Sequence, residues 1–280
     1  MYGPIAMDTA AIQGPASSLF ADLAEAFMSV DWIVPAYIQL GVLRRLAAQI
    51  LSAAPTDKHA VLARELPLLY QPEDLAAMLL ERYAKIKHVD AFKVQIAEAL
   101  EAAQLGLFHA AIATLVPVVE GTIRELADAR GQPIGNRTNK LVNEIDAEIA
   151  LASQLPAWCI GTPEEPTMKQ AIAERVVMLT VFRDFVRNTL LAQTSRYTGA
   201  GELNRHGIVH GLFKGYGCEA NFYKLVSFLD LLCFFIAIRT GSSGLAPDAT
   251  AASVCLAGYY RSLSIVRAAA VAAGARPGSD

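Results

Sequence analysis

The chain has 280 residues, of which 54% are hydrophobic and 18% charged, and its formal net charge is −3. This composition excludes wholesale disorder and supplies a large apolar core, in one large domain or in a core domain with an attachment. The overall charge does not indicate a nucleic-acid-binding protein. No basic segment precedes an apolar run at the start of the sequence, so a signal peptide is not expected and a cytoplasmic location is predicted.

The mean hydropathy of +0.33 is high for a soluble protein. The most apolar run, from Leu225 to Ile238, is shorter than the roughly 20 residues of a spanning helix and contains Asp230. It is therefore predicted to be a buried helix, and no membrane partner is expected. The four cysteines form no C-x-x-C pair, which disfavours a zinc ribbon or a thioredoxin-like motif and predicts buried free thiols.

Alanine, leucine and glutamate dominate, and apolar residues recur at spacings of three and four, so the chain is predicted to be all-α. One or two helices are expected from Ser17 to Leu51, interrupted near Pro35. Further helices are expected over 58–69 and from 72 to about 87. Together these make a helical N-terminal region, residues 1–88.

A helical hairpin follows, with its turn at 104–106. Its second helix carries an apolar stripe from Phe108 to Leu126, and Pro117 should bend that helix or start a separate one. Glu120 interrupts the stripe. Because a buried charge without a partner is costly, Glu120 is expected to pair with a cation.

The remainder of the chain is also helical in pattern. Residues 89–240 are predicted to form the main helical domain, and 241–280 a linker followed by an alanine-rich C-terminal helix that covers an apolar patch or mediates association. The segments expected after the hairpin are helices over 136–151 and 167–193, a glycine-punctuated stretch over 199–217, a helix from Asn221 as its N-cap to Gly241, and the final helix over 249–274.

The glycine-punctuated stretch reads GELNRHGIVHGLFKGYG. Asn204 suits an N-cap, with Arg205 and His206 in the first turn of a short helix. His206 and His210 are four residues apart and share a face, whereas a regular helix would put Arg205 about 140° away from His210. Four features would still allow Arg205 and His210 to act at one site. Arg205 lies at the helix start and has a long side chain, Gly207 loosens the turn, and a second copy of the chain could complete the site.

A hairpin bearing Glu120, a later long helix and the pattern Arg205-His206-x-x-x-His210 resemble the HEPN superfamily. Its signature is an arginine, a polar residue and a histidine. The context NRHGIVHG, followed by N-x-x-KL-x-x-x-LD-x-L, resembles an uncharacterised bacterial HEPN subgroup. The resemblance covers about 89–239 and implies a HEPN-like helical bundle, with both ends of the chain outside it.

The resemblance implies a metal-independent endoribonuclease in a defence or toxin-like setting, which uses no cofactor. His210 would move the proton of the ribose 2′-hydroxyl or of the leaving 5′-oxygen, and Arg205 would hold the scissile phosphate. His206 would position the phosphate or share the proton transfer, Asn204 would bind a phosphate oxygen or cap the helix, and Glu120 would orient Arg205 or a histidine. The partners implied are RNA, a second copy in a homodimer, and a neutralising or regulatory protein.

Three other interpretations of the motif stay open. The residues can be structural. His206 and His210 also have the spacing of a two-histidine metal site, although the adjacent glutamate of H-E-x-x-H is absent. The chain can also be a non-catalytic helical RNA-binding or protein-interaction module.

Overall fold

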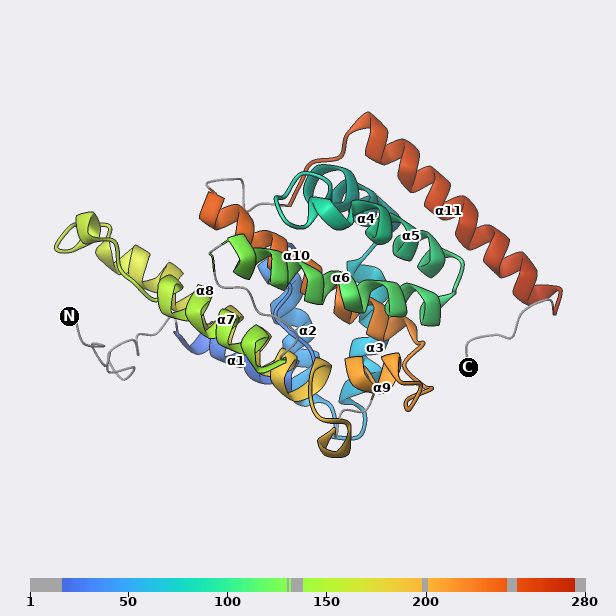
Figure 1. Ribbon diagram of the computed structural model, residues 1–280, viewed down its shortest axis with the longest axis horizontal. Coiled ribbons are helices and arrows are strands. Elements are labelled where there is room, and N and C mark those ends of the chain that lie inside the picture. The colour runs from blue at the N-terminus through green and yellow to red at the C-terminus, as the bar shows by residue number, and fades with distance from the viewer. Residues whose placement is uncertain (1–16, 130, 132–137, 198–200, 241–245, 275–280) are drawn as a thin grey trace.

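The computed structural model describes residues 17–129, 131, 138–197, 201–240 and 246–274, and every regular element in that part of the chain is a helix (Figure 1). The predicted all-α fold is confirmed. The main helices are α1 (Ser17–Met28), α2 (Leu40–Ser52), α3 (Lys58–Leu69), α4 (Pro72–Met78), α5 (Lys93–Gln104), α6 (Phe108–Ala129), α7 (Thr138–Ala152), α8 (Glu165–Phe185), α9 (Arg205–Val209), α10 (Glu219–Thr240) and α11 (Ala251–Ala272).

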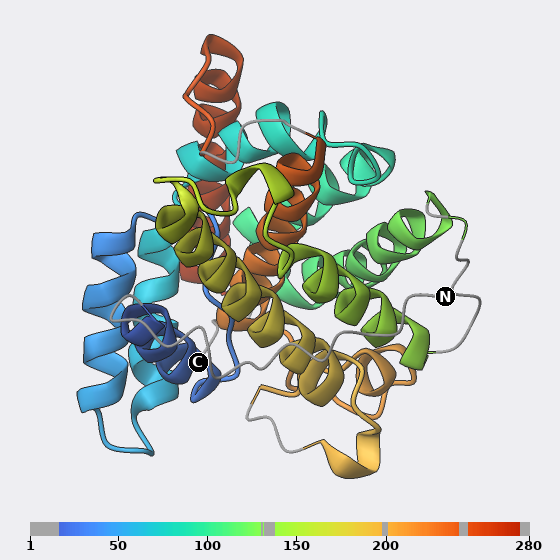
Figure 2. The same cartoon turned by 90° about the vertical axis from the view of Figure 1, so that its left-hand side faces the viewer.

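Helix α10 forms the centre of the molecule. It packs against α6 on one side and α3 on another, while α7 and α8 extend outward as a pair of helices (Figures 1 and 2). By length and composition Glu219–Ala237 is apolar enough to cross a membrane, but 89% of that window is buried inside the molecule. This burial is the arrangement expected of the core helix of a soluble protein.

The N-terminal region shares its core with α10. The Trp32 indole donates a hydrogen bond to the Ser227 hydroxyl at 2.9 Å, and the Tyr83 hydroxyl donates to Asp230. One continuous cluster of buried residues runs from Leu23 to Tyr260. The predicted boundary at residue 88 therefore lies within a shared core.

Two local expectations differ from the structure, and one of the two alternatives for Pro117 is excluded. Helix α10 begins at Glu219, so Asn221 lies inside its first turn and is not the N-cap. Its buried amide donates instead to the carbonyls of Gly201 and Tyr216 and holds two loops to α10. Helix α6 continues through Pro117 as one helix, so Pro117 does not start a separate one. Two of the four thiols, Cys218 and Cys255, are exposed because they lie in a loop and on an outward helix face.

Two ionisable side chains of α10 are buried. The Lys224 ammonium donates to the Val30 carbonyl at 2.8 Å, and burial lowers the pKa of Lys224 to about 8. Burial raises the pKa of Asp230 to about 7, although the hydrogen bond from Tyr83 acts in the opposite direction. The fold therefore favours the neutral form of both groups.

These two groups make stability depend on pH. Between the ordinary carboxyl pKa of 3.8 and about 7, the folded chain holds the Asp230 proton that the unfolded chain has lost, so stability falls as pH rises. Between about 8 and 10.5 the unfolded chain holds the Lys224 proton, so stability rises with pH. Stability is expected to be lowest near pH 7–8.

Asp230→Asn removes the carboxyl titration. The free energy of unfolding, measured with urea, should fall between pH 5 and pH 8. The fall is expected to be about 2 kcal/mol larger in the wild type than in this variant. Asp146→Asn is the control, because Asp146 is exposed and forms an ion pair with Arg183. The pH dependence of its stability should follow that of the wild type. Equal pH dependence in the wild type and Asp230→Asn would contradict the assignment.

Candidate functional site

Helix α9 is positioned by the side chain of Asn204. The Asn204 Oδ1 accepts a hydrogen bond from the Gly207 N–H at 2.9 Å, as an N-cap does. Its Nδ2 donates to the carbonyls of Thr189 and Ala192, both at 2.9 Å, and the residue is fully buried. Asn204 thus ties α9 to the end of the long helical segment that begins with α8. Two roles were predicted for Asn204, capping the helix or binding a phosphate oxygen. Its buried position and its three internal hydrogen bonds support the capping role.

Gly207 lets the chain turn tightly after α9. The Leu212 and Phe213 N–H groups both donate to the Gly207 carbonyl, at 2.8 and 3.1 Å. A Cβ atom at Gly207 would lie 2.2 Å from the Phe213 ring. Any larger residue would push the loop away from α9, so the glycine is required by close packing.

The expected partner of Glu120 is Arg205. The Arg205 Nε donates to Glu120 Oε2 at 3.1 Å across 85 residues of sequence, and so joins α9 to α6. The second oxygen of Glu120 accepts from Arg124 at 2.6 Å, one helical turn further along α6. The exposed fractions are 31% for Arg205, 15% for Glu120 and 28% for Arg124.

This trio carries a net charge of +1 at a partly exposed position. Ion pairs in contact with water contribute little to stability, so the main effect of Glu120 is to hold the two guanidinium groups in place. Sequence reasoning missed Arg124. The signal was its i,i+4 spacing from Glu120, which puts both residues on one face of α6.

The structure brings the two histidines of the motif together. The rings of His206 and His210 are parallel within 6°, with centroids 6.1 Å apart. His210 lies at the C-cap of α9 and is exposed, whereas His206 is half-buried. Burial lowers the pKa of His206, and the nearby Arg205 and His210 charges lower it further, against the opposing effect of Glu120. A neutral imidazole at this position can accept a proton.

The loop after α9 is held by two side chains. The Glu202 carboxylate accepts from the Lys214 and Gly215 N–H groups, at 3.0 and 2.5 Å. His109 of α6 donates through Nε2 to the Lys214 carbonyl at 2.9 Å and packs edge-on against Tyr216. His109 is therefore a loop-anchoring residue, a role that its place in the sequence did not indicate.

The motif lies on an open surface. Val209 and Leu212, on either side of His210, are exposed. A cavity of about 30 Å³ lies among α6, α7, α8 and α10, and one of about 310 Å³ lies between α8 and the segment that leads into α2. Neither cavity is lined by Arg205, His206 or His210. His210 is exposed, so a substrate can approach it from solvent.

In the part of the chain that the structure describes, no group of three or more histidine, cysteine or acidic side chains is arranged to hold a metal ion. His206 and His210 supply two ligands at most, whereas a catalytic zinc site uses three protein ligands. The described residues thus give the metal interpretation no third ligand.

Comparison of the chain with protein-family models, with curated proteins and with solved structures finds no match in any of the three. The HEPN resemblance therefore depends on the NRHGIVHG motif and the residues that surround it.

Proposed function

We propose that this chain is a metal-independent endoribonuclease of the HEPN type. The observation that supports this most is the contact between Arg205 and Glu120. The resemblance assigned Glu120, from a helix 85 residues earlier, the task of orienting the arginine or a histidine of the motif, and the two side chains are in contact. Arg205 keeps its terminal nitrogens for a substrate, because its contact with Glu120 uses Nε.

The side chains suit cleavage of RNA by its own 2′-hydroxyl. As the 2′-oxygen attacks phosphorus, its proton passes to a neutral imidazole, and a second proton is delivered to the 5′-oxygen as the P–O5′ bond breaks. His210, exposed at the end of α9, is assigned the direct contact with substrate, and His206 shares the proton transfer. Arg205 stabilises the negative charge that builds on the phosphate oxygens. The products are a 2′,3′-cyclic phosphate and a 5′-hydroxyl.

The same resemblance supports a wider setting for the enzyme. It would act in the cytoplasm, in defence or as a toxin, under the control of a neutralising or regulatory protein. A homodimer would place two copies of the motif at one cleft. The open position of the motif is compatible with such a pairing, because nothing in the described part of the same chain covers His210.

The test is cleavage of mixed RNA by the purified protein in EDTA. The wild type should cleave and leave 2′,3′-cyclic phosphate ends, and His210→Ala should cleave about a hundredfold more slowly. Val209→Ala is the matched control, since it truncates the exposed neighbour of His210 and should keep full activity.

The other outcomes are equally informative. Equal cleavage by the wild type and His210→Ala would contradict the proposal, and activity that EDTA abolishes would favour a metal-dependent hydrolase. RNA binding without cleavage would favour the non-catalytic binding module.

A further inference from the structure

The cavity of about 310 Å³ lies between α8 and the chain that joins α1 to α2. Residues 29–39 of that connection are not helical, although the run from Trp32 to Ile38 is apolar throughout. One wall of the cavity comes from this run and from the start of α2. The other wall is one face of α8, because its lining residues recur at spacings of three and four. The α8 residues on that face are Ala171, Glu174, Arg175 and Met178.

The interior of the cavity is apolar, and its rim reaches solvent. Val34, Leu43 and Met178 are buried, whereas Leu40 and Ala171 are exposed. The volume is at the lower end of the range of roughly 300–1,000 Å³ that small-molecule sites occupy. Since a water-sized group takes about 30 Å³, the space suits a ligand of about ten non-hydrogen atoms.

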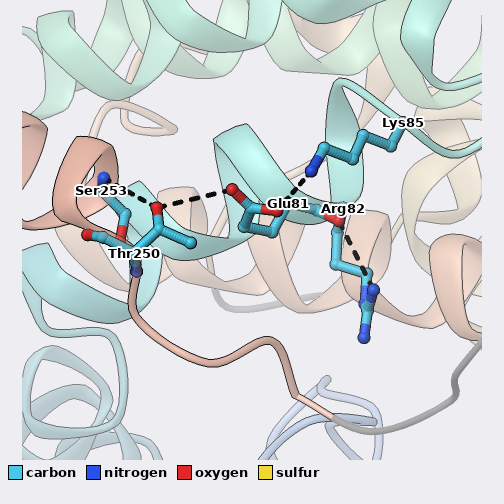
Figure 3. A network of polar contacts seen from close by, with 5 residues as sticks. All are labelled: Glu81, Arg82, Lys85, Thr250 and Ser253. Atoms are coloured by element: carbon cyan, nitrogen blue, oxygen red, sulfur yellow. Dashed lines mark hydrogen bonds and ion pairs between the residues drawn. The ribbon is translucent and has the colours of Figure 1, made fainter.

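Other half-buried charges of this protein show how such groups are satisfied. Glu81, in the segment that follows α4, pairs with Lys85 and accepts a hydrogen bond from Thr250 at the start of α11 (Figure 3). Arg183, further along α8 than the cavity, pairs with Asp184 at 2.9 Å. Each of these two charges therefore meets an opposite charge within the chain.

Arg175 is also half-buried, but its guanidinium has no such partner. In the part of the chain that the structure describes, no carboxylate pairs with it and no hydrogen bond engages it. The neighbouring Glu174 accepts from the Gln170 amide at 3.1 Å. A guanidinium presents its N–H donors as a planar fork that matches the two oxygens of a carboxylate. The cavity thus combines an apolar interior with a cation whose donors are available.

We propose that this cavity binds a small amphiphilic monocarboxylate, whose carboxylate pairs with Arg175 and whose apolar chain fills the interior. A chain of about eight carbons, as in octanoate, gives the expected ligand size. The inference is independent of the proposed nuclease function, because Arg205, His206 and His210 do not line the cavity.

The charges of the lining favour a carboxylate over two other head groups. An amine would be repelled by Arg175, and its counter-ion would be Glu174, which already accepts a hydrogen bond from Gln170. A neutral alcohol would cover the guanidinium without neutralising it, and a covered charge without a counter-ion is costly. Octanoate, octylamine and octan-1-ol therefore form a series in which only the head group changes.

The first test is calorimetric titration of the full wild-type chain with these three compounds. Octanoate should bind at one saturable site, with a dissociation constant on the order of 0.1 mM for a ligand of this size. Its affinity should exceed that of the other two at least tenfold. No binding of octanoate would remove the site, and equal affinity for all three would remove the role of Arg175. Tighter binding of octylamine would assign the head group to Glu174 and overturn the proposal.

Arg175→Gln tests the head-group contact. The substitution removes the charge but keeps a polar side chain, so the affinity for octanoate should fall at least tenfold while that for octan-1-ol stays the same. Arg44→Gln is the matched control, because Arg44 is exposed on α2 outside the cavity and should keep wild-type affinity. Unchanged octanoate binding in Arg175→Gln would contradict the assignment.

Ala171→Phe tests the location. Ala171 is exposed at the rim, so the fold should survive, as circular dichroism can verify, while the added ring occupies the space of the ligand. Octanoate and octan-1-ol should both lose at least tenfold in affinity. Ala60→Phe makes the same change at an exposed position of α3 and should bind both compounds as the wild type does. A folded Ala171→Phe protein with full affinity for octanoate would place the ligand elsewhere and refute the proposal.

Discussion

Arg205→Ala is expected to lower RNA cleavage about a thousandfold, the loss typical when a group that stabilises transition-state charge is removed. The fold should survive. Arg205 is partly exposed, and its partner Glu120 keeps the ion pair with Arg124, so no carboxylate is left buried without a partner. Cleavage in EDTA, with circular dichroism and urea unfolding of the same samples, measures both effects.

Arg124→Ala is the matched control for that experiment. It deletes the same guanidinium group from the same carboxylate, but from α6 and not from the motif. If the two arginines served only to neutralise Glu120, the two variants would lose stability and activity alike. A catalytic Arg205 instead predicts similar unfolding curves and a far larger loss of cleavage in Arg205→Ala.

Arg205→Lys refines the result. A lysine ammonium is a point charge, so it cannot hold Glu120 through one nitrogen while presenting a fork of two others to a phosphate. Cleavage between that of the wild type and that of the alanine variant is expected. Full activity in Arg205→Ala would remove the arginine from the reaction.

The helices were largely predictable because their signals are local. Apolar spacing and breaks at Pro35, Pro72 and Gly106 depend on residues close together in sequence, and α1 to α6 follow them closely. Asn221 misled because an asparagine before an apolar run suggests a cap. Its amide instead donates to the carbonyl of Tyr216 in the preceding loop and to that of Gly201, 20 residues earlier, and the sequence does not show where a loop folds back.

The site was predictable in part for a different reason. A carboxylate on an apolar stripe needs a cationic partner, so a cation was predicted beside Glu120. The motif then indicated that this cation is Arg205. His109 gave no such signal, because its role depends on a loop 105 residues away. The shared core was also not evident from the sequence, since Lys224 and Asp230 bond to Val30 and Tyr83, both within the predicted N-terminal region.

Asn204→Asp should destabilise the protein by more than about 3 kcal/mol, the cost typical of a buried charge without a suitable partner. The aspartate keeps an oxygen for the Gly207 N–H. It replaces the amide donor with a second oxygen that faces the Thr189 and Ala192 carbonyls, so two attractions become repulsions. Urea unfolding measures the loss, which should shrink at acidic pH as the carboxyl regains a proton.

Asn188→Asp is the matched control, because Asn188 is exposed at the end of the same helical segment and should change stability by less than about 0.5 kcal/mol. The pair of variants also decides between the two roles assigned to Asn204. A capping role requires the large loss of stability. An Asn204→Asp protein that unfolds like the wild type but no longer cleaves RNA would mean that this amide reaches the phosphate, and that α9 moves away from the long helical segment when substrate binds.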